Sequence, residues 1–564
     1  MIADPRERLR PWIWPIVMVG GLLLALRWGF NYGLGNQNTY LLQALRKVRP
    51  SGLVHDWLAA TCEDYHPVFT QLAAVLIWLD SSGWLIALGN VASVVAGAVA
   101  VFLIIREVCG DRRALPVYLL VVSFAGIGST YSVSGSYIFS TTFQPSTIGA
   151  VGHIFALLYF VRQRYLLSGI ILAVAGAFHA NYLVLAFPLF GLAHLFTGHR
   201  RLLVRWLAQL GPSLVPIAFL LPLLLGQTGS GNVEFARYIF QHVLNPQHYV
   251  PMNWLDQFVV YYAWCGLALV AGWRTLTGSE PARRLGRVWA ASILLVSIAT
   301  LLTTVVYLPV ISQLYIWRLA PLTVLMAQVF AAAGFVRYLF DGDPRISHRR
   351  RAGLFAVNAV LIWYVFRYHM GEYRDIHHGL MIALNVSFLI RPWLVHLLAG
   401  RSHVYAVVVV AGVWLTAAIA PTLDVTSRSN LIAGMPPDEQ ALYDWVATTR
   451  ESAVFLIPPG AGNFRYHSRR AVVVDAKSTP LHPDQLIEWY GRVQLVSGID
   501  HVSNRNEIGA GYARLDSARV IQIGVAYPFD YIVVRGTQEF AGMTGFEPVF
   551  QNDSYRVYRR TPSA

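Results

Sequence analysis

Long apolar stretches, with arginines at every second junction between them, run from Pro11 to about Pro421. The hydrocarbon core of a membrane is about 30 Å thick, so a helix that crosses it needs roughly 20 apolar residues. Hydrophobic residues make up 55% of the chain and charged residues only 13%. No single water-soluble core could bury so much apolar surface, so the sequence predicts a mainly α, polytopic helical membrane protein.

About thirteen spans are expected, with boundary errors of a few residues. The first follows Arg6, Arg8 and Arg10, and no small-residue cleavage pattern comes after it. We therefore expect a retained helix rather than a removed signal peptide. The expected spans are roughly 11–30, 82–105, 114–132, 147–161, 165–179, 182–197, 207–226, 258–273, 288–306, 316–336, 353–367, 379–390 and 404–422.

The arginine alternation also orients the spans. Cytoplasmic loops carry an excess of lysine and arginine, and a cytoplasmic N-terminus puts the arginine-rich loops on that side. An odd number of spans then places the C-terminus on the other side. The net charge of +14 is explained by arginines in the cytoplasmic loops, which lie beside the anionic inner leaflet of the membrane. Membrane lipids are therefore expected partners, and nucleic acid is not.

The composition becomes polar after Pro421, and short β-rich runs alternate with helical ones. Such alternation predicts a small α/β domain. Neither of the glycine-rich nucleotide-binding patterns is present there, so no nucleotide site is indicated. We therefore divide the chain into a transmembrane domain, residues 1–422, with a large first outer loop at 31–81, and an extracytoplasmic α/β domain, residues 423–564. Strands are expected at 453–457, 471–474, 531–534 and 555–558, and helices at 436–449, 484–496 and 517–526.

The first outer loop is the segment in which chemistry is most expected. Its basic cluster of Arg46, Lys47 and Arg49 either ends a surface helix that lies on the membrane or contacts lipid phosphates. Asp56 and Asp64 follow. A carboxylate that is partly buried beside a membrane can serve as a general base, and each of these two could equally be an ordinary hydrogen-bonded loop residue.

This order of elements resembles the GT-C superfamily of membrane glycosyltransferases: a span, a long acidic outer loop, many further spans and an outer α/β domain. The resemblance implies a membrane enzyme that takes a sugar from a polyprenyl-phosphate donor and passes it to a lipid or glycan acceptor at the outer face. The phrases His55-Asp56-Trp57 and Asp64-Tyr65-His66-Pro67 are similar to pieces of bacterial proteins of this architecture. We therefore expect a bacterial inner membrane, with the C-terminal domain in the periplasm.

The resemblance also implies an acid shortly before Tyr40, where Asn36 and Asn38 stand instead. An amide cannot act as a general base, so Asp56 is the expected substitute and Asp64 the alternative. We expect Asn36, Asn38, Tyr40 and His66 to contact the substrate. The polyprenyl-phosphate sugar is the implied donor, no cofactor is evident, and a divalent metal is possible but not indicated.

Three residues outside the first loop are further candidates. An arginine at membrane depth is usually paired or functional, so Arg318 either clamps the donor phosphate or snorkels to the outer head groups. His179 lies either in an outer turn or beside an intramembrane cavity. Gln144 belongs to the polar and aromatic segment 134–146, which is typical of a sugar- or lipid-contacting loop and of any interfacial loop.

The histidine and cysteine patterns do not indicate a metal site. His377 and His378 are adjacent and point different ways, and the three cysteines Cys62, Cys109 and Cys265 predict neither a metal cluster nor a disulfide framework. Two other function classes stay open. One is a polytopic transporter, although we find no inverted repeat. The other is a non-catalytic lipid- or glycan-binding protein that retains the transferase fold.

The arginine alternation leads to a test of topology. A reporter enzyme that works only in the cytoplasm, fused after Ala564, should be inactive, because the C-terminus is expected outside the cytoplasm. The same reporter fused after Arg113, in a loop expected inside, should be active. Activity of the Ala564 fusion would contradict the whole orientation.

Overall fold

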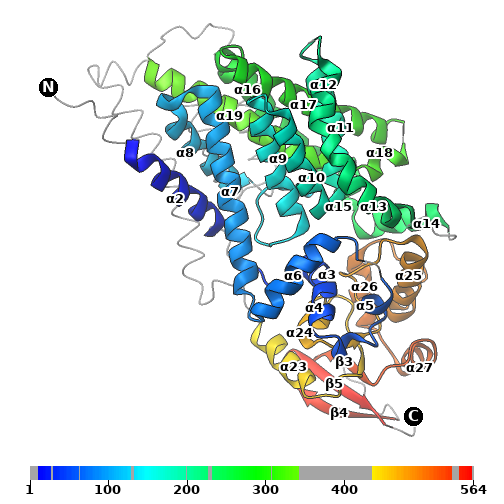
Figure 1. Cartoon of the computed structure of the whole chain (residues 1–564). Coiled ribbons are helices and arrows are strands. Elements are labelled where there is room, and N and C mark those ends of the chain that lie inside the picture. Colours follow the sequence, from blue (N-terminus) through cyan, green and yellow to red (C-terminus); the bar gives the residue numbers. More distant parts are fainter. Residues whose placement is uncertain are drawn as a thin grey trace.

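The computed structural model describes residues 10–26, 30–62, 64–128, 133–198, 200–226, 232–306, 308–341, 435–536 and 545–561. The spans expected at 353–367, 379–390 and 404–422 lie outside these residues, as does the domain boundary expected between residues 422 and 423. Figure 1 shows the long helices in the upper part of the molecule and the C-terminal domain, coloured yellow to red, below them. The short helices of the first outer loop, coloured blue, lie between the two parts.

Apolar helices form the larger part of the molecule. Four helical stretches are long and apolar enough to cross a membrane, namely Trp84–Cys109, Leu202–Leu220, Glu280–Thr304 and Ile311–Arg337. A multi-pass helical membrane protein is therefore confirmed, whereas the expected number of about thirteen spans is not. The helices of this part are α2 (Ile13–Leu26), α7 (Trp84–Cys109), α8 (Asp111–Gly128), α9 (Pro145–Val161), α10 (Tyr165–Phe178), α11 (Ala180–Leu195), α12 (Leu202–Leu210), α13 (Leu214–Gly226), α14 (Val233–Tyr238), α15 (Pro246–Tyr249), α16 (Leu255–Leu276), α17 (Glu280–Thr304), α18 (Pro309–Gln313) and α19 (Ala320–Asp341).

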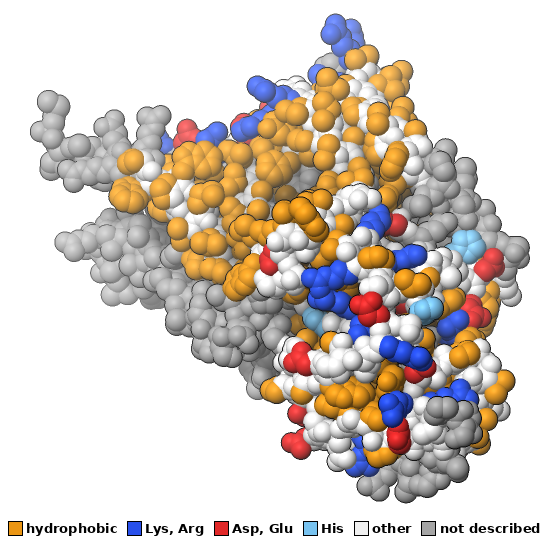
Figure 2. Space-filling model, turned by 60° about the horizontal axis from the view of Figure 1, so that its bottom comes forward, with side chains coloured by type: hydrophobic (Ala, Val, Ile, Leu, Met, Phe, Trp, Pro, Cys, Tyr) orange, Lys and Arg blue, Asp and Glu red, His pale blue; other side chains and the backbone are white. Residues whose placement is uncertain are grey.

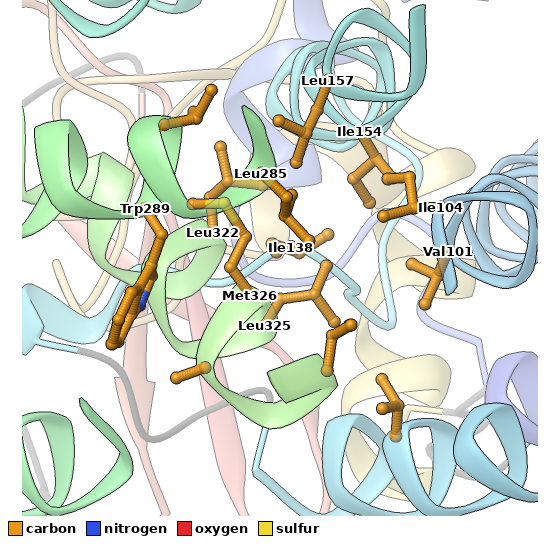
Figure 3. Packing of buried hydrophobic residues seen from close by; sticks show 14 of the residues in the cluster. Val101, Ile104, Ile138, Ile154, Leu157, Leu285, Trp289, Leu322, Leu325 and Met326 are labelled. Atoms are coloured by element: carbon orange, nitrogen blue, oxygen red, sulfur yellow. The ribbon is translucent and has the colours of Figure 1, made fainter. Parts of the chain in front are cut away.

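The largest buried cluster joins helices that are far apart in the sequence. Figure 3 shows side chains of α7, α9, α17 and α19 packed against one another, among them Ile104, Ile154, Leu285 and Met326. In α16 and α19, small residues allow a close approach, because a Cβ atom on Gly334 would collide with the backbone of α16. This packing holds the start of α19, and the turn that precedes it, in place.

The charged ends of several helices meet on one face. Arg162 at the end of α9 pairs with Glu107 of α7 at 2.9 Å, and Arg284 near the start of α17 donates a hydrogen bond to the carbonyl of Val161. Figure 2 shows a broad apolar surface over the helical part, with Lys and Arg side chains along the rim farthest from the C-terminal domain. The arginine junctions that are spaced along the sequence are thus brought together in space.

The C-terminal domain is the expected α/β layer. Its five strands are arranged in the order β2-β1-β3-β5-β4; β1 is parallel to β2 and β3, and β5 is antiparallel to β3 and β4. The sequence did not predict β4, α24 or α26. The elements are α23 (Pro437–Ala447), β1 (Val454–Leu456), α24 (Phe464–Ser468), β2 (Ala471–Val472), α25 (Pro483–Ser497), α26 (Arg505–Tyr512), α27 (Ser517–Ala526), β3 (Tyr531–Arg535), β4 (Phe546–Gln551) and β5 (Tyr555–Arg560).

The first outer loop packs directly on this domain. The loop contains α3 (Gln37–Tyr40), α4 (Leu42–Val48), α5 (Trp57–Thr61) and α6 (Pro67–Leu79). The hydroxyl of Tyr65 accepts a hydrogen bond from the backbone nitrogen of Leu481 at 2.9 Å, and the guanidinium of Arg492 lies 4.2 Å from the centre of the Trp57 ring. Segments that are about four hundred residues apart in the sequence thus form one folded unit below the membrane helices (Figure 1).

Asp56 supplies the buried charge of this contact. It is fully buried at the start of α5, where its Oδ1 accepts a hydrogen bond from the backbone nitrogen of Ala59 at 2.8 Å. Its Oδ2 accepts from Arg465 Nε at 2.8 Å and from the backbone nitrogen of Val472 at 3.1 Å. Arg465 also pairs with Asp475, which is buried as well. Both oxygens of Asp56 are therefore engaged inside the protein. A general base needs an oxygen that faces the acceptor, so the expected catalytic role of Asp56 gives way to a structural one.

We expect Asp56→Asn to lower the free energy of unfolding by about 3–5 kcal/mol, because it leaves a buried arginine with one carboxylate fewer. The measurement is thermal unfolding of the purified protein in detergent. Asp64→Asn is the matched control, with an expected change within about 1 kcal/mol, because Asp64 is partly exposed and lies 3.5 Å from the exposed Lys47. An unchanged melting temperature in Asp56→Asn, together with lost activity, would return the catalytic role to Asp56.

Candidate functional site

Arg318 lies at the centre of a cluster of aromatic side chains. It belongs to η7 (Ile316–Leu319), a turn of 3-10 helix before α19, and the preceding Tyr315 has the left-handed backbone conformation with φ 51°. Arg318 Nη1 lies 2.8 Å from His179 Nε2. The guanidinium carbon lies 4.6 Å from the centre of the Tyr315 ring and 5.4 Å from that of Tyr182. The side chain is thus held among protein groups that come from two separate parts of the chain.

Two side chains of the first outer loop complete this cluster. His66 precedes α6, and its ring centre lies 4.8 Å from that of His179 and 5.3 Å from that of Tyr40. Burial, and next the positive charge of Arg318, lower the pKa of His66 to about 4, so its ring is neutral at pH 7. Burial raises the pKa of Tyr40 to about 12. The cluster therefore combines a permanent cation with a neutral imidazole and a protonated phenol.

Tyr315 connects the cluster to a third histidine, His248. Its hydroxyl lies 3.0 Å from Ser136 Oγ and 3.1 Å from His248 Nδ1. His248 belongs to the short helix α15, which the sequence did not single out. These hydrogen bonds hold the Tyr315 ring against Arg318. The position of this ring therefore depends on polar contacts as well as on packing.

Gln144 borders the cluster through Tyr137. Its Nε2 donates to Ser146 Oγ at 2.8 Å and to the hydroxyl of Tyr137, which lies within electrostatic range of Tyr40. Its Oε1 is buried and accepts no hydrogen bond from the described residues. A buried amide oxygen without a partner is ready to accept a hydrogen bond from a ligand hydroxyl.

The charge of Arg318 is not neutralised by the described part of the chain. No aspartate or glutamate among those residues lies within ion-pair distance of it, and the groups around it are histidine and tyrosine. An unpaired arginine at membrane depth is costly, and a guanidinium binds phosphate or carboxylate through parallel hydrogen bonds. The arrangement can therefore hold an anionic group between aromatic walls.

Asp64 lies beside the cluster without entering it. One of its oxygens accepts hydrogen bonds from Thr70 Oγ1 at 2.7 Å and from the backbone nitrogen of His66 at 3.3 Å. The carboxylate thereby fixes the turn that presents His66. Its negative charge also opposes the lowering of the His66 pKa.

Asn36, directly before α3, and Asn38, within it, face the C-terminal domain. Asn36 Oδ1 accepts a hydrogen bond from Lys477 Nζ at 2.7 Å, and Asn38 Nδ2 donates to Asn463 Oδ1 at 2.9 Å. The structure therefore brings together five of the expected residues and leaves four around them. The five are Tyr40, His66, Gln144, His179 and Arg318, and the four are Asn36, Asn38, Asp56 and Asp64.

Sequence reasoning missed Tyr182, Tyr315 and His248. Tyr182 and Tyr315 stand three residues from His179 and Arg318 respectively, and this spacing was a usable signal on a helical segment. His248 had no such signal.

The described residues contain no group of three or more His, Cys, Asp or Glu side chains placed to hold a metal ion. His377 and His378 lie outside them. Metal dependence therefore stays a prediction from the sequence.

Comparisons with known proteins place this fold. No curated protein matches the sequence. Residues 437–496 match a family described as a domain of unknown function, DUF6798. The chain is similar to the crystal structure of ArnT from Cupriavidus metallidurans bound to undecaprenyl phosphate, with 14% identity, a TM-score of 0.53 and 98% of each chain covered. It is also similar to the apo state of ArnT, with 12% identity, a TM-score of 0.51 and 99% of each chain covered. At these identities the likeness shows the fold, so the chain has the polytopic membrane fold of ArnT, and the architecture expected from the resemblance to the GT-C superfamily is confirmed.

Proposed function

We propose that the protein transfers a glycosyl group from a polyprenyl-phosphate donor to a lipid or glycan acceptor at the outer face of the membrane. The observation that carries this proposal is Arg318, a cation without a carboxylate partner among the described residues, enclosed by Tyr182, Tyr315 and His179. The related ArnT structure is described as bound to undecaprenyl phosphate, which supports a polyprenyl phosphate as the anion.

In the proposed reaction the acceptor oxygen attacks the anomeric carbon of the sugar. The bond from that carbon to the phosphate oxygen breaks, and the polyprenyl phosphate leaves with the electron pair. Arg318 stabilises the negative charge that develops on the leaving phosphate, which is the electrostatic contribution expected of a fixed cation in a site with little water. The buried oxygen of Gln144 is placed to accept a hydrogen bond from a sugar hydroxyl.

We propose that His66 is the general base that accepts the proton of the acceptor hydroxyl. Its ring is neutral at pH 7 and contacts His179, the hydrogen-bond partner of Arg318. A phosphate on Arg318 would offset the positive charge that depresses the His66 pKa, so donor binding would make His66 a stronger base. Asp64 is then a positioning residue that holds the backbone of His66.

Arg318→Lys tests the phosphate contact. The ammonium keeps the charge but cannot form two parallel hydrogen bonds, so we expect binding of undecaprenyl phosphate to weaken by about tenfold or more. Arg205→Lys is the matched control, because Arg205 also lies over a tyrosine ring, that of Tyr165 at 5.5 Å, and should leave binding unchanged. Equal affinities of Arg318→Lys and the unchanged protein would remove Arg318 from the donor site.

The pKa of His66 predicts the pH dependence of transfer. A base must be neutral to accept a proton, so activity is lost as the pH falls through its pKa. With a pKa of about 4 in the free protein, kcat/KM should stay level from pH 7 to about pH 5 and fall only below that, whereas an ordinary histidine would give a fall near pH 6.5.

His66→Gln should lower the rate by about 10²–10⁴-fold, and Asp64→Asn should lower it much less. An unchanged rate in His66→Gln, with loss in Asp64→Asn, would move the role of base to Asp64. If undecaprenyl phosphate binds and no variant or condition gives transfer, the non-catalytic binding protein is the better description.

A further inference from the structure

The C-terminal domain brings a second group of cations to the first outer loop. Lys477 Nζ donates a hydrogen bond to Asn36 Oδ1 at 2.7 Å. Asn36 directly precedes α3, and Tyr40, at the end of the same helix, belongs to the Arg318 cluster. A helix rises about 1.5 Å per residue, so roughly 6 Å of α3 separates the two ends. Lys477 therefore stands one short helix away from the Arg318 cluster.

Arg505 is the second cation of this group. It is the first residue of α26 and is half-buried, and its Nε is buried and makes no hydrogen bond with the described residues. Burial, and next the charge of Arg505, lower the pKa of Lys477. Burial and then the charges of Arg318, Lys477 and Arg505 lower the pKa of His248. Arg318, Lys477 and Arg505, which come from three separate elements, thus lie within electrostatic range of His248.

The carboxylate that acts electrostatically on both of these cations, Asp475, is already paired with another residue. Asp475 is buried, pairs with Arg465, and accepts hydrogen bonds from the backbone nitrogens of Lys477 and Ser478 at 2.7 and 2.6 Å. Its partner Arg465 also holds Asp56. Within the described part of the chain, neither Lys477 nor Arg505 forms an ion pair, so positive charge remains unbalanced between the two parts of the molecule.

We propose that Lys477 and Arg505 bind an anionic group of the acceptor, a phosphate or a carboxylate, beside the donor phosphate on Arg318. The proposal rests on the proposed glycosyl transfer, because the acceptor oxygen must approach the anomeric carbon next to that phosphate. Two half-buried cations that repel each other are stabilised by an anion between them. The acceptor class is therefore an anionic lipid or glycan, and the C-terminal domain selects it.

The experiment titrates inorganic phosphate into the full-length protein, with and without bound undecaprenyl phosphate, and follows binding by thermal shift. The variants are Lys477→Gln and Arg505→Gln, their charge-preserving counterparts Lys477→Arg and Arg505→Lys, and Arg535→Gln as the control. Arg535 is an exposed arginine of β3 in the same domain. Undecaprenyl phosphate binding is measured separately for each protein.

We expect the unchanged protein to bind phosphate even when loaded with undecaprenyl phosphate. The two glutamine variants should lose about tenfold in phosphate affinity, the order of one charged hydrogen bond, while their affinity for undecaprenyl phosphate stays within about twofold. Lys477→Arg and Arg535→Gln should bind phosphate as the unchanged protein does, and Arg505→Lys should lose less affinity than Arg505→Gln, because it keeps the charge but not the fork of parallel donors.

Equal phosphate binding in the glutamine variants would overturn the proposal, as would phosphate binding that undecaprenyl phosphate abolishes. Loss of undecaprenyl phosphate binding in the glutamine variants would also overturn it, because both cations would then belong to the donor site. Failure of undecaprenyl phosphate to bind any of the proteins would contradict the proposed function, and the titration without it would still decide whether Lys477 and Arg505 bind an anion.

Discussion

The buried ion pairs of Arg465 determine how the rest of the site is assembled. Arg465 holds Asp56 of the first outer loop and Asp475 of the C-terminal domain, and all three side chains are almost wholly shielded from water. Separating Arg465 from either partner would leave an uncompensated buried charge, which is strongly destabilising. The ion pairs therefore hold the two segments together. Through this contact α3 and α6 are held below the membrane helices, and Tyr40 and His66 reach Arg318.

The chemistry of the site follows from an imbalance of charge. The carboxylates of Asp56 and Asp475 both pair with the buried Arg465. In contrast, Arg318, Lys477 and Arg505 have no ion-pair partner in the described part of the chain. Tyrosine and histidine rings surround Arg318, and they orient the guanidinium without neutralising it. A site of this kind favours ligands that bring negative charge, and it disfavours charging of the nearby imidazoles. The proposed phosphate recognition follows from this positive field, and the same field adds to burial in keeping His66 neutral.

The sequence predicted the features that depend on local pattern. The apolar helices and the α/β character of the C-terminal domain followed from hydropathy and alternation, and Arg318 was singled out as an arginine in an apolar segment. Elements with weak local signals were missed: α26 contains two glycines, which disfavour helix, and β4 contains Pro548. The role of Asp56 could not be foreseen, because Arg465 lies 409 residues away in the chain. A carboxylate near a membrane surface has the same sequence signature whether it is free or paired.

Binding of the donor phosphate by Arg318 is the step on which the proposed glycosyl transfer depends. Its most direct test is an experimental structure of the full-length protein with undecaprenyl phosphate. We expect density for the phosphate within hydrogen-bond distance of the Arg318 guanidinium, with the rings of Tyr182 and Tyr315 beside it. Phosphate density elsewhere, for example at the basic cluster of Arg46, Lys47 and Arg49, with Arg318 still bonded only to His179, would contradict it.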